Sequence, residues 1–418
     1  MQAVNAEIIA IGDELLYGQI MDTNSHWISQ ELDAVGVRVV RKTTVGDNRT
    51  DILTAFEEAS KRADLILITG GLGPTQDDLT KPLLAEFFGC EIVEVPEAVA
   101  AVSAYFTRRG REMTLLNTLQ GHLPTCCTYV PNEVGTAPGM WFEQKGCYWM
   151  SMPGVPHEMK KLVKDFVLPK LSQVFELPVI YHKLIKTAGI GESWLADLIK
   201  DWENALPTHI RLAYLPSLGH VKLRLTAFGT NKEQLQQEVA AQIQILLPQI
   251  EKYVYGYDEE TLETALGKLL KNAGKTIALA ESCSGGYVSH LITTVPGSSA
   301  YFQGAVVPYH NAFKERILGV KSETLSSHGA VSEATVAEMA EGVRKLFNAD
   351  YGLASSGIAG PDGGTADKPV GTVWIGCAGP EGVETRKLQL TQDRMLNIQL
   401  TGVAVLNLFR TCFLPTHK

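Results

Sequence analysis

The feature that most constrains the fold is an alternation of short apolar runs with amphipathic stretches, and it occurs twice along the chain. Residues 7–90 read as strand, helix, strand, helix, strand. The same rhythm restarts near residue 261, with further apolar runs at 275–280, 300–309 and 351–357 between helical stretches. Such an order is typical of a parallel sheet flanked by helices. We therefore expect two α/β domains, the first of them doubly wound.

The stretch between them has a different pattern. Residues 220–229 alternate polar and apolar side chains with period two, which indicates a half-exposed sheet in a small α+β module. A turn-rich acidic stretch over 256–260 precedes the next helix, and we place the main domain boundary there. Because 418 residues exceed what one core usually organises, we expect three parts. They cover residues 4–168, 169–256 and 260–415.

Charge and cysteine content narrow the class of protein. The 37 Lys and Arg residues against 46 Asp and Glu residues give a net charge of -9, which argues against a broad contact with nucleic acid or anionic lipid. No segment approaches the roughly 18 uninterrupted apolar residues of a membrane helix, and no signal peptide is evident. The seven cysteines are odd in number and form no CxxC pair, so reduced thiols are expected. We expect a cytoplasmic protein with no direct nucleic-acid or membrane partner.

A loop with the sequence E-S-C-S-G-G, residues 281–286, joins a predicted buried strand to a predicted helix. Backbone N–H groups at such a place are unpaired and favour a developing negative charge. Ser282 is therefore a candidate nucleophile for a carbonyl carbon, and Gly285 and Gly286 would let a ligand approach the backbone closely. The alternative is an ordinary serine N-cap. Cys283 is a rival nucleophile, since a thiol at a helix N-terminus can have a lowered pKa.

Two further loops follow predicted strands. In P-Y-H-N-A-F-K, Asn311 is a good N-cap and would place Lys314 in the first turn of a helix. The helix dipole lowers a lysine pKa by less than about one unit, so burial beside Ser282 would have to make Lys314 a neutral base. A solvated lysine is the alternative. The glycine-rich loop 355–364 is expected to cradle a phosphate or close over a ligand, with a long exposed turn as the alternative.

In the first α/β part, loops at the carboxyl ends of the strands are expected to share one pocket. The segment T-G-G-L-G-P-T-Q-D-D-L-T, residues 69–80, offers glycine amides to a phosphate and two carboxylates to a hydrated divalent ion. Helix capping is the alternative for the acidic pair. The expected pocket residues are Gly70, Gly71, Gly73, Thr75 and Asn24. The expected metal ligands are Asp13, Glu14, Asp77 and Asp78.

The motifs of the last third occur in an order that resembles the CinA family. They are, in sequence, E-S-C-S-G-G, G-S-S-A-Y-F-Q-G, Y-H-N-A-F-K, H-G-A-V-S and S-G-I-A-G-P-D-G-G-T. In that family the C-terminal domain is the nicotinamide mononucleotide deamidase. The resemblance implies a Ser/Lys amidohydrolase without metal or other cofactor, with Ser282 as nucleophile, Lys314 as base and Tyr309 in the same pocket. The implied substrate-binding positions are Glu281, Ser284, Gly285, Gly286, Ser299, Gly357, Gly360 and Arg394.

One departure from the family pattern concerns the start of the last predicted helix. Similar sequences often carry two arginines there, whereas only Arg394 matches in this chain, and Met395 to Ile398 follow Asp393 and Arg394 without a second arginine. The planar fork of a guanidinium group suits a phosphate. Arg394 is therefore the candidate for binding the substrate phosphate.

Residues 4–168 resemble the MoaB/MogA-like, molybdopterin-binding fold that forms the other half of CinA proteins. The glycine loop, G-T-A-P-G-M at 135–140 and P-G-V-P-H-E-M at 153–159 carry this resemblance, and the middle module looks KH-like. It implies a metal-dependent ADP-ribose pyrophosphatase that uses Mg, Mn or Co, small nucleotides as ligands, and a homodimer. The alternatives are a non-catalytic partner protein tied to competence or DNA damage, and a molybdopterin-binding protein.

Overall fold

The structure is a computed structural model that describes residues 4–75, 77–144 and 146–413. Two compact units make up the chain. One unit comprises the chain up to Tyr181 together with Phe228–Gln236, and the other comprises His182–Ala227 and the chain from Gln237 onward. Along the chain, the first passage from one unit to the other lies between Tyr181 and His182. Residues 414 and 415, the end of the predicted third part, lie outside the described residues.

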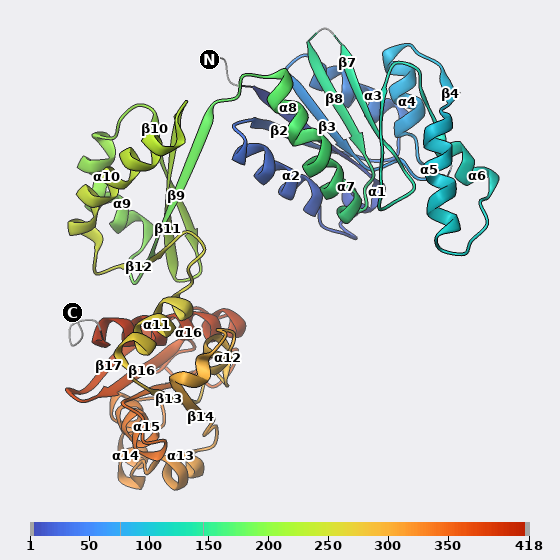
Figure 1. Cartoon of the computed structure of the whole chain (residues 1–418). Helices are drawn as coiled ribbons and strands as arrows, with labels where there is room; N and C mark the ends of the chain where they lie inside the picture. Colours follow the sequence, from blue (N-terminus) through green and yellow to red (C-terminus); the bar gives the residue numbers. More distant parts are fainter. Residues whose placement is uncertain (1–3, 76, 145, 414–418) are drawn as a thin grey trace. The chain divides into compact units, whose positions relative to one another are not determined.

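The first unit contains a six-stranded sheet and a separate two-stranded one. Their strands are β1 (Asn5–Ile11), β2 (Arg38–Val45), β3 (Leu65–Thr69), β4 (Ile92–Glu94), β5 (His122–Pro124), β6 (Thr128–Val130), β7 (Gly139–Gln144) and β8 (Cys147–Met152). The large sheet has the order β2-β1-β3-β8-β7-β6 (Figure 1). Strands β1, β2, β3 and β8 are parallel, whereas β7 runs antiparallel to both of its neighbours.

Helices cover both faces of this sheet. They are α1 (Asp13–Leu16), α2 (Thr23–Ala34), α3 (Arg49–Ser60), α4 (Thr80–Phe88), α5 (Pro96–Thr107), α6 (Leu115–Thr118), the short η1 (Leu119–Gly121), α7 (Pro156–Leu162), the π-helical η2 (Val163–Val167) and α8 (Leu168–Val174). Along β3, Leu65 and Leu67 pack with α2, α7, η2 and α8, whereas Ile66 and Ile68 pack with α3, α4 and α5. Because successive side chains of a strand point to opposite faces, one apolar run supplies both layers. The doubly wound prediction is confirmed.

One expectation about cysteines is wrong. Cys90 and Cys126 form a disulfide, with their Cα atoms 6.0 Å apart. Cys90 follows α4 and Cys126 follows β5, and the antiparallel pairing of β4 with β5 brings these two points together. The two cysteines are 36 positions apart, so their spacing in the sequence does not predict that they pair. The free thiols are those of Cys127, Cys147, Cys283, Cys377 and Cys412.

The middle module has a four-stranded sheet and two long helices. These elements are β9 (Val179–Ala188), α9 (Glu192–Asn204), β10 (Ile210–Ser217), β11 (His220–Gly229), α10 (Lys232–Ile250) and β12 (Val254–Tyr257). The sheet order is β10-β11-β9-β12. On β11, Val221, Leu223 and Leu225 are buried and the intervening residues are partly exposed, as the period-two pattern predicts.

The C-terminal domain has a five-stranded sheet in the order β14-β13-β15-β16-β17. Its strands are β13 (Ile277–Glu281), β14 (Phe302–Val306), β15 (Tyr351–Gly357), β16 (Thr372–Gly379) and β17 (Gly382–Gln389). Strands β14, β13 and β15 are parallel, and β16 and β17 are antiparallel additions. The carboxyl ends of the three parallel strands therefore meet at one edge of the sheet.

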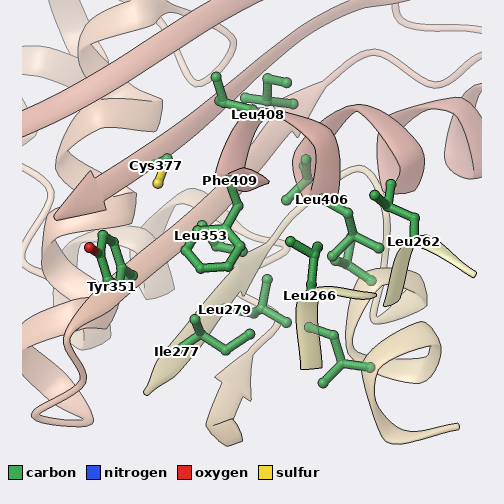
Figure 2. Packing of buried hydrophobic residues seen from close by; sticks show 14 of the residues in the cluster. Leu262, Leu266, Ile277, Leu279, Tyr351, Leu353, Cys377, Leu406, Leu408 and Phe409 are labelled. Carbon is green, nitrogen blue, oxygen red and sulfur yellow. The ribbon is translucent and has the colours of Figure 1, made fainter. Parts of the chain in front are cut away.

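Two helical layers enclose this sheet. The helices are α11 (Leu262–Ala273), α12 (Tyr287–Thr293), the short η3 (Ser298–Ala300), α13 (Asn311–Leu318), α14 (Ser322–His328), α15 (Glu333–Leu346) and α16 (Arg394–Phe413). Figure 2 shows Ile277 and Leu279 packed with Leu266 and Phe409, in the layer formed by α11, α12 and α16. The small side chains Ala278 and Ala280 lie on the other face, against α15. Alternation of large and small side chains on β13 thus sets how closely each layer approaches.

The sequence pattern missed two C-terminal elements, β17 and α14. Strand β17 carries few apolar residues, as an exposed edge strand does, so no apolar run marks it. Helix α14 has only seven residues. Within the described ranges, no helix is both long enough and apolar enough to cross a membrane.

Candidate active site

Three loops meet at the carboxyl edge of the C-terminal sheet. Strand β13 ends at Glu281, β14 ends at Val306 and β15 ends at Gly357, and these strands are neighbours in the sheet. The segments that follow them carry Ser282, then Tyr309 and Lys314, then Gly360. Helix α16 begins at Arg394 beside the same edge, because its guanidinium contacts two of these loops. The three predicted loops are therefore brought together by strand order.

Glu281 has a different role from the predicted one. Its carboxylate is buried and accepts hydrogen bonds from the backbone N–H groups of Gly286, Val288 and Ser289, at 2.7 to 3.1 Å. It also accepts from the hydroxyls of Ser284 and Ser289. The carboxylate therefore caps the first turn of α12, where a negative charge is favoured. The prediction that Glu281 contacts substrate is wrong, because its lone pairs are already occupied.

Ser284 is likewise an internal residue and not a substrate contact. It is 2% exposed, and its hydroxyl bonds Glu281 at 2.8 Å and the Ser355 hydroxyl at 2.7 Å. The Ser282 backbone N–H donates to the carbonyl of Ser355 at 3.0 Å. These bonds tie the loop after β13 to β15, so the loop has a fixed shape. Gly285 and Gly286 have φ values of 62° and 100°, which only glycine adopts without strain.

The capping by Glu281 changes which amides are free to stabilise an oxyanion. The N–H groups at the start of α12 are used, as described above. By contrast, the backbone N–H groups of Cys283 and Ser284 donate to no other residue among those described, and the Cys283 N–H contacts only its own thiol. They follow Ser282 directly in the chain. The loop amides that stay available to a ligand therefore precede the first residue of α12.

Lys314 is buried, with 1% of its surface exposed. Its ammonium group donates to the carbonyl oxygens of Pro308 at 2.9 Å and Tyr309 at 3.4 Å, and no carboxylate pairs with it in the described part of the chain. Burial lowers the pKa of Lys314 below its ordinary value, and the thiolate form of Cys283 would oppose that shift. The ammonium group is thus within electrostatic reach of the loop that carries Ser282. A solvated lysine is excluded.

The helix that carries Lys314 begins one residue earlier than predicted. His310 is the N-cap of α13, and its Nδ1 accepts a hydrogen bond from the Ala312 N–H at 3.3 Å. Asn311, the predicted cap, is the first helical residue. Lys314 is therefore the fourth residue of α13, still within its first turn.

Arg394 joins two of the loops. Its Nη1 donates to the carbonyl of Gly360 at 2.7 Å, and its Nη2 donates to the hydroxyl of Tyr309 at 2.9 Å. Both Arg394 and Tyr309 are exposed, with Tyr309 at 62%. Neither bond uses a carboxylate, so among the described residues no hydrogen-bonded carboxylate neutralises the charge of Arg394 at the rim of the site. That charge is available to an anionic group of a ligand.

Asn397 is a positioning residue that the sequence analysis did not identify. It is 1% exposed, and its Nδ2 donates to the carbonyls of Ala359 and Thr391, each at 2.9 Å. Its Oδ1 accepts from the N–H and the hydroxyl of Thr391, also at 2.9 Å. The side chain thus holds the glycine-rich loop against the start of α16. The signal in the sequence was an asparagine one turn into the helix, where its side chain can bond to nearby backbone groups.

Two other expectations change. Ser299 lies in η3, directly before β14, and so at the amino edge of the sheet, opposite the loops described above. The structure does not bring it to the site.

The Cys283 thiol is buried, and burial raises its pKa to about 12, so it is a poor nucleophile near neutral pH.

A second candidate site lies in the first unit. A cleft of about 450 Å³ opens at the carboxyl ends of β1 and β3, as predicted. Among the predicted residues, Asn24, Gly70, Gly71, Gly73, Glu14 and Asp78 line it. Thr75, Asp13 and Asp77 are not among its lining residues. The amide oxygens Asn24 Oδ1 and Gln120 Oε1 are buried in this cleft region without a partner in the described residues.

The predicted metal ligands do not gather into one group among the described residues. The carboxylate of Asp78 turns back and accepts hydrogen bonds from the N–H groups of Gly73 at 2.7 Å and Thr75 at 2.9 Å. The Asp13 carboxylate instead accepts a hydrogen bond from the backbone N–H of Asp47, at 3.2 Å. The Asp47 carboxylate in turn accepts one from the backbone N–H of Asp13, at 3.0 Å. Within residues 4–75, 77–144 and 146–413, no group of three or more His, Cys, Asp or Glu side chains could hold a metal ion. Capping and turn formation use these carboxylates.

Comparison with known proteins gives matches along the chain. Three family models match: the probable molybdopterin binding domain over residues 7–173, the damage-inducible protein CinA KH domain over 182–256 and the CinA C-terminal domain over 259–413. A CinA-like protein of Cytophaga hutchinsonii is 53% identical over 97% of each chain, and a putative competence-damage inducible protein of Halothermothrix orenii is 44% identical over 95% of each. The crystal structure of competence/damage inducible protein CihA from Agrobacterium tumefaciens is 34% identical, covers 36% of this chain and 92% of that one, and has a TM-score of 0.35.

Proposed function

The chain belongs to the CinA family, and we propose that its C-terminal domain hydrolyses the carboxamide of nicotinamide mononucleotide to nicotinate mononucleotide and ammonia. In this proposal Ser282 is the nucleophile and Lys314 is the base. The observation that carries it is the buried Lys314, which has no carboxylate partner in the described residues and a pKa lowered by burial.

A buried, charged lysine without a counter-ion lowers the stability of the folded protein. Removing an ammonium group from water without a counter-charge destabilises the protein by several kcal/mol, on the order of the penalty for a buried unpaired charge. The cost falls when the amine is neutral, which is the form that can accept a proton. Two carbonyl oxygens hold the amine in place without supplying the negative charge that would keep it protonated.

The proposed reaction needs only groups at this edge of the sheet. Neutral Lys314 takes the proton of the Ser282 hydroxyl while Oγ bonds to the carboxamide carbon, and the carbonyl oxygen becomes an oxyanion. Collapse of that intermediate breaks the C–N bond, and Lys314 returns the proton to the departing nitrogen, which leaves as ammonia. Water then attacks the acyl-serine and loses one proton to Lys314. Breaking of the C–Oγ bond releases the product acid, Lys314 returns the proton to Ser282 Oγ, and the acid loses its own proton to solvent to give nicotinate mononucleotide.

The N–H groups of Cys283 and Ser284 are the proposed oxyanion donors. They are the amides next to the nucleophile that donate to no other residue among those described. Removal of one such donor typically costs about 3 kcal/mol of transition-state stabilisation. No hydrogen bond links the Ser282 hydroxyl to Lys314 in the described, ligand-free chain. Such catalytic contacts often tighten only when substrate binds.

The test is ammonia release from nicotinamide mononucleotide by the full chain in the presence of EDTA. We expect wild type and Cys283→Ser to be active, and Ser282→Ala and Lys314→Met to lose activity by about a thousandfold or more. Lys314→Arg is the matched control for charge, because a guanidinium group cannot deprotonate near neutral pH. Circular dichroism must show that each variant is folded.

Three results would contradict the proposal. Wild type that releases no ammonia would remove the activity. An active Ser282→Ala with an inactive Cys283→Ser would assign the nucleophile to the thiol. A Lys314→Arg variant with wild-type kcat would show that Lys314 acts through charge and not as a base.

We further propose that the cleft of the first unit binds a nucleotide with a pyrophosphate group, such as ADP-ribose. The buried oxygens of Asn24 and Gln120 can accept hydrogen bonds from ribose hydroxyls or a base amine, which would satisfy both. The glycine loop after β3 offers close backbone approach to phosphate oxygens. The described carboxylates do not form a metal site, so this proposal covers binding alone.

Isothermal titration with ADP-ribose, with EDTA and then with Mg, Mn or Co, tests this second proposal. We expect binding in EDTA that Asn24→Leu weakens about tenfold or more, because the substitution removes a buried acceptor. Gln30→Leu, at an exposed position of the same helix that does not line the cleft, is the matched control. Binding that is absent in all conditions, or unchanged by Asn24→Leu, would contradict it.

A further inference from the structure

Cys377 and Cys412 lie together at the end of the C-terminal domain opposite Ser282. Cys377 is on β16, directly across from Leu353 of β15 and near the amino end of that strand. Cys412 is in the last turn of α16, whose first residue, Arg394, is at the candidate active site. Figure 2 shows Cys377 beside Tyr351 and Leu408 in the layer between the sheet and α16. Neither thiol has a part in the deamidase proposal.

Both cysteines line one cavity of about 380 Å³. The other walls are formed by the turn between β16 and β17 and by side chains of the flanking elements, including Tyr351, Glu384, Arg386 and Leu408. Cys377 is 2% exposed, whereas Cys412 is only half-buried. A small molecule that enters the cavity therefore meets Cys412 first, with Cys377 behind it.

The two thiols contact each other. Both thiols line the same cavity, and the neighbouring Cys377 thiol holds the pKa of Cys412 below its ordinary value of 9.0. The positive charge of Arg386 also lowers it, whereas burial and Glu384 oppose the shift. Burial raises the pKa of the partly exposed thiols Cys127 and Cys147 to about 11. The Cys377–Cys412 pair thus contains a thiol that ionises more readily than Cys127 or Cys147.

A role in core packing alone does not explain why Cys377 and Cys412 lie together. A buried cysteine commonly serves as a small apolar core residue, and Cys377 alone would fit that description. It does not account for a second thiol in contact with the first, placed at the wall of a cavity with a cation beside it. Attack by a thiolate on a disulfide needs an accessible, ionisable sulfur and a second thiol within bonding reach.

We propose that Cys412 and Cys377 form a redox-active dithiol that undergoes thiol–disulfide exchange with small-molecule disulfides in this cavity. The Cys412 thiolate attacks a disulfide RS–SR, forming a mixed disulfide with R and releasing RS⁻. Cys377 then loses its proton and attacks the Cys412 sulfur, which forms the Cys377–Cys412 disulfide and releases the second RS⁻. The protein dithiol is oxidised by two electrons, RS–SR is reduced to two thiols, and the two protein protons end on them.

The product bond would link β16 to the last turn of α16. These elements are covalently separated by 34 intervening residues, so the link restrains the unfolded chain and stabilises the C-terminal domain. The inference does not depend on the deamidase proposal, because the dithiol and Ser282 are at opposite ends of the sheet. The two can fail independently.

The test uses the full chain and glutathione disulfide as the probe. Samples are quenched with N-ethylmaleimide over time, digested and mapped by mass spectrometry. We expect wild type to form the Cys377–Cys412 disulfide, Cys377→Ser to accumulate a glutathione adduct at Cys412, and Cys412→Ser to remain unmodified at Cys377. The initial rate of modification at Cys412 should exceed the rates at Cys127 and Cys147 by about tenfold. A lower pKa increases the fraction of thiolate and decreases the nucleophilicity of each thiolate, and the first effect is the larger one.

Wild-type mapping needs no substitution, so it remains informative if Cys377→Ser folds poorly; Cys377→Ala is the alternative variant. Modification of Cys412 no faster than of Cys127 and Cys147 would overturn the inference. So would a stable adduct on wild-type Cys412 with no Cys377–Cys412 bond, since the second thiol would then not resolve it.

Discussion

Arg394 Nη2 donates a hydrogen bond to the Tyr309 hydroxyl across 2.9 Å, although 84 residues separate them in the chain. The bond connects the first residue of α16 to the loop that also carries Lys314. A second donor of the same guanidinium contacts the Gly360 carbonyl. One exposed cation thus links the loops on which the proposed base and the glycine-rich segment lie.

Removing this cation should weaken substrate binding more than chemistry. For Arg394→Ala we expect KM for nicotinamide mononucleotide to rise about tenfold to a hundredfold, from the loss of about 1.5 to 3 kcal/mol of charged hydrogen bonds, with a smaller change in kcat. Steady-state kinetics measure this. Nicotinamide riboside, which lacks the phosphate, is the control substrate, and an equal loss on it would argue against phosphate recognition. Tyr309→Phe should have the smaller effect.

Activity should rise with pH through the lowered pKa of Lys314. The neutral amine is the active form, so kcat/KM should increase as pH passes that pKa, which lies below the ordinary value of 10.5, and level off above it. A pH–rate profile in overlapping buffers measures it. A profile that is flat or falls with rising pH across this range would contradict Lys314 as the base.

The same shift predicts how stability depends on pH. The unfolded chain binds the lysine proton more tightly than the folded protein, so the free energy of unfolding should increase as pH rises from the lowered pKa toward 10.5. Comparison with Lys314→Met isolates the contribution, because methionine does not titrate. Parallel stability curves for the two proteins in urea over that pH range would show that the pKa is not lowered.

Glu281→Gln should destabilise the C-terminal domain by about 2 to 3 kcal/mol, because a charged acceptor of five hydrogen bonds becomes neutral and one of its oxygens becomes a donor. Urea unfolding followed by near-ultraviolet circular dichroism measures the change. Ser289→Ala, which loses only its own hydroxyl contact to the carboxylate, should cost about 1 kcal/mol. Equal stability of Glu281→Gln and wild type would show that the carboxylate is not the cap.

Asn397→Asp separates two functions of one side chain. Aspartate can still accept from Thr391 but cannot donate to the Ala359 carbonyl, so the glycine-rich loop loses its attachment. We expect a loss of about 1 to 3 kcal/mol in stability together with a higher KM, and a similar KM for Asn397→Ala. If Asn397→Asp keeps the wild-type KM, the bond to Ala359 does not position the loop.

Local pattern determined the architecture and the region of the candidate site. The alternation of apolar runs with amphipathic helices predicted both α/β domains. A helix on the surface of a sheet buries one face and is amphipathic, whereas a central strand buries both faces and is apolar throughout. Strand ends then located the loops of Ser282, Lys314 and Gly360. Association of the chain into a homodimer stays a prediction.

Only the tertiary structure decided what each polar group in those loops does. Glu281 was predicted to contact a ligand and Asp78 a metal ion. Both carboxylates instead accept hydrogen bonds from backbone N–H groups of nearby residues. Sequence spacing does not reveal which donor lies close to a carboxylate in the folded chain. Cys90 with Cys126, and Cys377 with Cys412, became neighbours through strand pairing and helix packing. Burial of Lys314 without a counter-ion has the same origin: the sequence determined that a lysine follows β14, and packing of α13 removed it from water.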